Sequence, residues 1–175
     1  MRILFAATAL FTAMQLVPVE MRTNPHTNPA HTMEARIEVP PHIQTMLKTS
    51  CANCHSNETH WPWYSSVAPL SWMLARDVNQ ARSAMNFSDW TSRPGKAKGL
   101  LAASCAGVQS QRMPPANYRL LHREAELTAE ETEAFCAWTK SESRRIASKP
   151  AVNRSPVEPS SGVHTSLEHN SPPRI

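Results

Sequence analysis

Glycine is scarce in this sequence: the 175 residues contain only four, at positions 95, 99, 107 and 162. Dinucleotide-binding and phosphate-binding loops need several glycines within about ten residues, because only glycine lets the backbone approach the phosphates closely. The chain therefore has neither a Rossmann fingerprint nor a P-loop. With 15 prolines against 4 glycines, most turns must use the fixed φ of proline rather than a positive φ. This balance favours helices joined by stiff loops and disfavours an all-β fold.

A basic stripe is also lacking. The formal net charge is +4, but basic residues exceed acidic ones by three from residue 140 onward, so the C-terminal segment carries most of it. Residues 36–139 hold ten basic and nine acidic side chains. Binding to a phosphate backbone requires a concentrated basic surface, so we expect no nucleic acid partner. The sequence shows no internal repeat of about 20 to 50 residues, and no convincing catalytic triad or acid–base pair.

One long apolar run is present, from Ile3 to about Val19, behind the basic residue Arg2. This pattern over residues 1–20 predicts an export signal, either cleaved after a small residue such as Ala13 or kept as a membrane anchor. A buried N-terminal helix is the alternative, but it would have no polar face and no cap. The rest of the chain is therefore expected in the periplasm, soluble or anchored to the inner membrane.

Both flanks of the central region are poor in apolar periodicity. Residues 21–40 are rich in Thr, Asn, Pro and His and predict an extended tether. Residues 146–175 are dominated by Ser, Pro, Asn and His and predict a disordered tail, because they cannot bury enough apolar surface to offset their ordering entropy. The folded domain is expected over residues 41–145.

Helical periodicity occurs in four places within this domain: from Pro41 to the residue before Cys51, from Pro69 to Met85, over about 96–108, and from Thr128 onward. Proline is favoured in the first turn of a helix. Thr128 begins a Thr-Ala-Glu-Glu capping box. No segment alternates convincingly with a period of two, so the predicted fold class is all-α.

The candidate chemistry lies at Cys51-Ala52-Asn53-Cys54-His55. Two thiols three residues apart at the end of a helix project to the same side and can form thioethers with the two vinyl groups of one porphyrin. The following histidine then lies under the iron as a proximal ligand. The motif predicts one covalent haem c per chain, held by Cys51 and Cys54 and ligated by His55.

Other uses of the two thiols remain open. A redox-active dithiol usually stands in a βαβ context, which the sequence does not show. A zinc site needs a second ligand pair at close spacing, whereas Cys105 and Cys136 are 31 residues apart without partners nearby. A disulfide within the motif would be strained at the end of a helix.

Met113, in Met113-Pro114-Pro115, is the candidate for the second axial ligand. The residue before a proline favours an extended conformation, and the two prolines stiffen the segment that would hold the thioether. A neutral sulfur ligand favours ferrous iron and hence electron transfer. The alternatives are Met113 as a core residue, His122 as the ligand, and His60 or an open sixth position.

Several stretches carry a family resemblance: Gln15-Leu-Val-Pro-Val-Glu, His55-Ser-Asn-Glu-Thr-His-Trp-Pro-Trp-Tyr-Ser-Ser-Val-Ala-Pro-Leu-Ser-Trp, Asn86-Phe-Ser-Asp-Trp, Arg112-Met-Pro-Pro-Ala-Asn-Tyr and Leu121-His. Over about residues 15–140 the chain resembles bacterial exported haem-binding domain proteins related to cytochrome c. The resemblance implies a class I cytochrome c-like fold of about four helices around a covalent haem. It also implies His55 as the proximal ligand and Met113 as the distal one.

Aromatic residues follow the attachment motif closely. Trp61, Trp63, Tyr64 and Trp72 could gather at the porphyrin rim and bond its propionates, although packing in the core is the alternative. Tyr118, which follows the Met-Pro-Pro segment, completes the candidate cofactor-binding residues.

Cys105 and Cys136 fall on the third and fourth expected helices. In an oxidising compartment they can form a disulfide, and two unpaired buried thiols are the alternative.

The sequence thus predicts a periplasmic or membrane-tethered monohaem cytochrome that passes single electrons between redox partner proteins. The rival hypothesis is a haem-based peroxidase or small-ligand sensor with an open or histidine-ligated sixth position.

Overall fold

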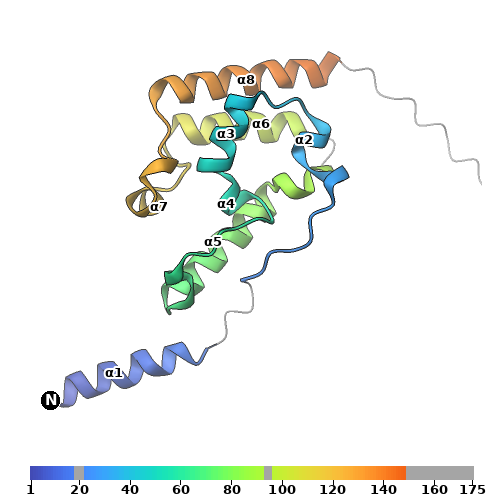
Figure 1. The fold of residues 1–175 in the computed structure, drawn as a ribbon. Coiled ribbons are helices and arrows are strands. Elements are labelled where there is room, and N and C mark those ends of the chain that lie inside the picture. Colours follow the sequence, from blue (N-terminus) through green and yellow to red (C-terminus); the bar gives the residue numbers. More distant parts are fainter. Residues whose placement is uncertain (18–21, 93–95, 149–175) are drawn as a thin grey trace, which may run out of the picture.

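Helices make up the regular structure of residues 1–17, 22–92 and 96–148, which are the residues that the computed structural model describes. No strand occurs in these ranges, so the predicted all-α fold class is confirmed (Figure 1). The α-helices are α1 (Arg2–Gln15), α2 (Met33–Arg36), α3 (Pro41–Ser50), α4 (Ala52–His55), α5 (Leu70–Ala84), α6 (Ala97–Gln109), α7 (Ala116–Leu121) and α8 (Ala129–Ser148). Short 3-10 turns span Pro29–His31, Trp63–Ser66, Phe87–Ser92 and Arg123–Ala125.

The long helices α3, α5, α6 and α8 lie where the apolar periodicity predicts them. Their ends follow local chemistry: Pro41 opens α3 in its first turn. Thr128 and Glu131 form the expected capping box before α8, because each side chain accepts a hydrogen bond from the other's backbone N–H, at 3.2 and 2.9 Å. The short helices α2, α4 and α7 have four to six residues, which is too few to show a helical periodicity in the sequence.

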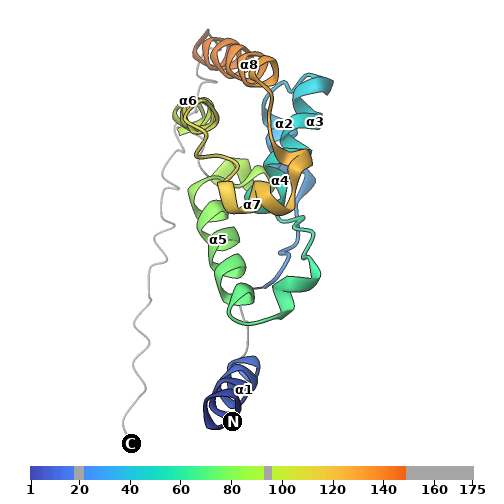
Figure 2. The same cartoon turned by 90° about the vertical axis from the view of Figure 1, so that its left-hand side faces the viewer.

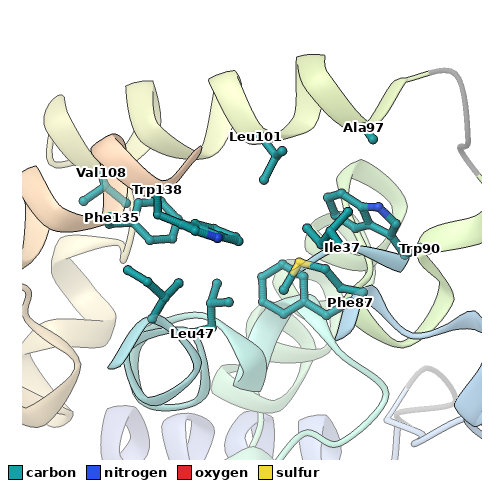
Figure 3. Packing of buried hydrophobic residues seen from close by; sticks show 11 residues of the cluster. Ile37, Leu47, Phe87, Trp90, Ala97, Leu101, Val108, Phe135 and Trp138 are labelled. Atoms are coloured by element: carbon teal, nitrogen blue, oxygen red, sulfur yellow. The ribbon is translucent and has the colours of Figure 1, made fainter. Parts of the chain in front are cut away.

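The hydrophobic core is built from α3, α6, α8 and the segments around α2 and residues 87–90. α6 and α8 lie side by side along one face of the domain (Figures 1 and 2). Side chains from these elements point toward one another in Figure 3. The buried cluster consists of Met33, Ile37, Ile43, Leu47, Phe87, Trp90, Ala97, Leu101, Val108, Phe135 and Trp138.

The segment before α3 departs from the expected tether. Met33 and Ile37 are only 1% and 6% exposed and belong to the core. The backbone of Glu38 is held from both sides by α8, because Trp138 Nε1 donates to its carbonyl at 2.9 Å and its N–H donates to Glu142 Oε1 at 3.4 Å. The prediction of an extended tether over residues 21–40 is therefore wrong for the part of that range containing α2. Apolar residues recur in this short stretch at Met33, Ala35, Ile37 and Val39, but they are too few to have predicted α2, and Met33 and Ile37 nevertheless lie in the core.

The N-terminal apolar run forms α1, whose side chains are not buried. Gln15 at its end bonds the backbone of Ala68, with distances of 3.0 Å from Ala68 N to Oε1 and 3.3 Å from Nε2 to Ala68 O. Among the helices in the described part of the chain, none has both the length and the apolar character needed to cross a membrane. Whether residues 1–20 act as a signal or an anchor stays a prediction.

At the C-terminus, α8 continues to Ser148, and Ile146 packs against the core. The expected boundary of the tail at residue 146 is therefore too early. The predicted disorder of the tail otherwise falls on residues 149–175, which lie outside the described residues.

Candidate functional site

The motif Cys51–His55, which the sequence suggests as the haem attachment motif, stands at the junction of α3 and α4. Cys51 ends α3 with a non-helical backbone (φ −127°, ψ −40°), and its carbonyl accepts hydrogen bonds from the N–H groups of Cys54 and His55 at 3.1 and 2.9 Å. This tight turn brings three reactive side chains of the motif to one side. Cys51, Cys54 and His55 all line the same cavity, and both thiols are free.

That cavity has a volume of about 490 Å³, which lies within the range of roughly 300–1,000 Å³ typical of cofactor sites. Its wall is mostly apolar. Besides the motif, α5 supplies residues such as Ala81 and Ala84, α6 supplies Ser104 and Val108, and α8 supplies Phe135. The segment from Met113 to Pro115 and Tyr118 of α7 complete the wall. A flat apolar cofactor suits such a lining better than a charged one does.

His55 is oriented by two neighbours. Its Nδ1 lies 3.0 Å from the carbonyl oxygen of Met85, which caps the C-terminal end of α5, and its ring stacks on Phe87 at a centroid distance of 5.9 Å. Burial lowers the pKa of His55 below its usual value, which favours the neutral imidazole that binds metals. An Nδ1–H bonded to a carbonyl leaves Nε2 as the ligating atom, the arrangement in which a metal-binding histidine is normally held.

The two motif thiols lack the electrostatics of a reactive dithiol. Burial, reinforced by the neighbouring Cys54, raises the pKa of Cys51 to about 12. Burial and the nearby Asp77 also raise the pKa of Cys54. Redox-active cysteines have lowered pKa values, because the thiolate is the nucleophile. The surroundings of Cys51 and Cys54 therefore disfavour the redox-thiol alternative. As for a metal ion, no group of three or more His, Cys, Asp or Glu side chains suited to hold one occurs within the described ranges.

Met113 lies on the segment that joins α6 to α7. The segment folds back on the end of α6, because the N–H groups of Arg112 and Met113 both donate to the Gly107 carbonyl, at 3.0 and 3.1 Å. Gln111 makes this reversal possible with a positive φ of 55°. Met113 then lines the cavity that the attachment motif also lines, while 45% of the residue stays exposed.

The histidines considered as alternative distal ligands are placed differently. The two ring nitrogens of His122 are already engaged, with Nε2 at 2.9 Å from the Tyr64 hydroxyl and Nδ1 at 3.2 Å from Glu124 Oε1. The ring also stacks on Tyr118 at 4.3 Å. Neither His122 nor the exposed His60 lines the cavity. Of the three side chains, Met113 alone does so.

Only one of the five candidate aromatic residues reaches the cavity. Tyr118 lines it and accepts a hydrogen bond from Asn53 Nδ2 at 2.8 Å. The chain after His55 instead turns away toward the start of α5, as Figure 1 shows. The expectation of an aromatic rim is therefore corrected for the other four residues, which are absent from the cavity wall: Trp61, Trp63, Tyr64 and Trp72.

Their actual surroundings differ from one another. Trp63 is 81% exposed, and Trp61 donates from Nε1 to Asn24 Oδ1 at 3.2 Å. Trp72 Nε1 is buried without a hydrogen-bond partner among the described residues. Proximity in sequence misled the prediction, because the polar loop that separates these residues from His55 leads the chain out of the site.

Two contributors to the site were missed by the sequence reasoning. Phe87 belongs to the stretch Asn86-Phe-Ser-Asp-Trp, one of those that carry the family resemblance. Its place in that stretch could have indicated that it belongs to the site. Met85 contributes its carbonyl oxygen, and a backbone group leaves no trace in residue type.

Cys105 of α6 and Cys136 of α8 form a disulfide in the structure. Their Cα atoms are 5.0 Å apart and the S–S distance is 1.97 Å. The bond joins the two helices that lie side by side and leaves Cys51 and Cys54 as free thiols.

The fold and the site together define a class of protein: a helical domain with a cofactor-sized apolar cavity lined by two thiols, a buried histidine and a methionine. A family model described as a haem-binding domain matches residues 9–141. The chain therefore belongs to this family of haem-binding domains, and haem is its cofactor. Searches among curated proteins and among solved structures returned no match.

Proposed function

We propose that this haem-binding protein is a monohaem c-type cytochrome that carries single electrons between redox partner proteins in the periplasm. Cys51 and Cys54 would hold the porphyrin through thioethers, and His55 and Met113 would bind its iron. The observation that carries the proposal is that the attachment motif and Met113, 58 residues later in the sequence, line one cavity.

Each residue has a distinct task in this function. The thioethers fix the cofactor, so that it stays with the protein in both oxidation states. His55 donates its Nε2 lone pair while the Met85 carbonyl holds the ring, and Met113 supplies a soft sulfur that favours the ferrous state. When bound, haem supplies a one-electron couple. The apolar wall limits the access of water, which reduces the reorganisation that accompanies a change of charge.

Export and partner binding belong to the same proposal. The apolar run of α1 is typical of an export signal and so supports export. Export would bring the chain to the compartment in which bacteria attach c-type haem. The disulfide between Cys105 and Cys136 fits an oxidising compartment. A membrane tether through residues 1–20 is compatible with both. Nucleic acid is not among the proposed partners.

The test is expression of the full chain in bacteria that mature c-type cytochromes. We expect a protein whose mass under denaturing conditions includes one haem, and whose ferric spectrum has the long-wavelength charge-transfer band of sulfur-ligated iron. The double variant Cys51→Ser with Cys54→Ser should lose the covalent haem. The matched control, Cys105→Ser with Cys136→Ser, should keep it.

Two results would overturn parts of the proposal. Haem that separates from the wild-type chain on denaturation would eliminate covalent attachment. A high-spin ferric spectrum without the sulfur band would eliminate Met113 as the ligand and support a peroxidase or a small-ligand sensor instead.

A further inference from the structure

The hydrogen bond between His55 and Met85 lies in the middle of a set of side-chain bonds that join the same two segments. One segment is the loop that leaves α4, and the other is the end of α5 with the residues after it. On the α5 side, Arg82 Nε donates to the carbonyl of Ser56 at 2.7 Å. On the far side, Asn57 bonds the residues that follow Met85. The pair of His55 and Met85 is therefore held from both directions.

The bonds on the far side form a closed cycle. The Asn57 N–H donates to Ser88 Oγ at 3.0 Å, and Asn57 Oδ1 accepts from Asn86 Nδ2 at 2.9 Å. The cycle closes because the Ser88 N–H donates to Asn86 Oδ1 at 2.9 Å. Asn57 and Ser88 are 7% and 6% exposed. The bond between Asn57 and Ser88 is buried, and the two bonds of Asn86 are partly buried, so water has limited access to the cycle and the three side chains hold one another in place. We name Asn57, Asn86 and Ser88 the amide clamp.

The amide clamp bears directly on the surroundings of His55. Asn86 and Ser88 are the sequence neighbours of Phe87, whose ring stacks on His55. Asn86 also directly follows Met85, whose carbonyl oxygen faces His55 Nδ1. Met85 has left the helix (φ −158°, ψ 128°), so no helical hydrogen bond fixes the peptide group that carries this carbonyl. On the side away from α5, the amide clamp holds this peptide group in place.

We propose that Asn57 and Ser88 are positioning residues that set the reduction potential of the haem by fixing the Met85 carbonyl against His55. This inference rests on the proposed axial role of His55. A strong hydrogen bond at Nδ1–H makes the imidazole a better electron donor, which stabilises ferric iron and lowers the potential. Loosening the clamp weakens that bond, so the potential rises. Neither side chain lines the cofactor cavity, so their effect on the haem passes through the residues between them and the cavity, Met85, Phe87 and His55.

The experiment uses the haem-loaded full chain with Asn57→Ala, Ser88→Ala and the conservative Ser88→Thr. Two quantities are measured: the reduction potential, and the solvent exchange rate of the His55 Nδ1 proton by NMR of the ferric protein. We expect both alanine variants to have a higher potential and an exchange rate about fivefold faster, the factor that corresponds to one ordinary hydrogen bond. Ser88→Thr retains the hydroxyl and should restore both quantities toward wild type.

The matched control is Asn28→Ala, which removes a different asparagine bond, from the Ala30 N–H to Oδ1 at 3.0 Å, at the start of a 3-10 turn. It should change neither quantity. Unchanged potential and exchange in both Asn57→Ala and Ser88→Ala would overturn the inference while the haem assignment stands. If Asn57→Ala does not accumulate, the smaller change Ser88→Ala decides alone. A wild-type chain without bound haem would overturn the proposed function and this inference together.

Discussion

At the scale of single residues, the site depends on which polar atoms are already paired. His55 has one ring nitrogen at the Met85 carbonyl, which leaves the other for the iron ligation that we propose, whereas His122 has both nitrogens near partners, Tyr64 and Glu124. Met113 has a thioether with no such partner and lies in the cavity wall. The sequence favours Met113 as the distal ligand and leaves His122 and His60 as alternatives. In the structure Met113 lines the cavity, whereas neither histidine does.

The axial assignment leads to a prediction at this scale. Replacing Met113→Ala should remove the sulfur band of the ferric spectrum and lower the reduction potential, because the ferrous state loses its soft ligand. His122→Gln should leave both unchanged, since His122 lies behind Tyr118 and outside the cavity wall. Visible spectroscopy with potentiometry measures both variants. The reverse pattern, a normal Met113→Ala spectrum and an altered His122→Gln spectrum, would assign the ligand to His122.

At the scale of the elements, α6 and α8 are the pair that the disulfide fixes. α6 carries Cys105 and the end of α6 supports the turn that leads to Met113, because Gly107 accepts the two hydrogen bonds of that turn. α8 carries Cys136 and brings Phe135 to the cavity wall. The disulfide therefore stabilises the pair of helices that supports the segment with Met113. It lies apart from Cys51 and Cys54.

Removal of the disulfide should lower the free energy of unfolding and leave the haem content of the protein unchanged. For a separation of 31 residues, the chain-entropy model gives a loss of about 3 to 4 kcal/mol in the free energy of unfolding of Cys105→Ser with Cys136→Ser. Denaturant unfolding followed by far-UV circular dichroism measures this change, with reduced wild type as a second comparison. The haem content per chain should stay the same. A stability equal to that of the oxidised wild type would show that the bond does not form in solution.

At the scale of the whole molecule, the domain begins earlier than the apolar periodicity suggests. The segment with α2 packs against residues 87–92, which places Met33 and Ile37 in the core, and the backbone of Glu38 bonds Trp138 and Glu142 of α8. Glu142 is buried and balanced by Arg145, whose Nε lies 2.6 Å from Oε2. The family match from residue 9 agrees with a unit that includes residues before α3.

Two truncations test this boundary. A chain that starts at Arg22 lacks α1 but keeps the buried segment, so its stability should be close to that of the full chain. A chain that starts at Pro41 lacks Met33 and Ile37, and at about 1.5 to 3 kcal/mol for each buried side chain it should be about 3 to 6 kcal/mol less stable. Both truncated chains are exported behind the same foreign, cleavable signal so that they can acquire haem, and denaturant unfolding of the two haem-loaded proteins gives the comparison. Equal midpoints would support a tether that contributes nothing to the domain.

The parts of this protein that the sequence determined are those with a local cause. Four long helices follow from periodicity and caps such as Thr128 with Glu131, and the proposal of covalent haem follows from the spacing of Cys51, Cys54 and His55. The absence of glycine clusters excluded nucleotide-binding loops for the same local reason. Helical repeats and short-range spacing operate within a few residues, so they can be read without knowing what packs against them.

Tertiary structure decided what depends on distant partners. In the structure Met33 and Ile37 lie in the core, whereas Trp63 is exposed to solvent. Met113 lines the cavity, and Cys105 forms a disulfide with Cys136. None of these outcomes has a local signal, because each depends on the direction that the chain takes after a turn. The Met85 carbonyl is the clearest case, since a backbone atom gains its role only when another segment places a histidine against it.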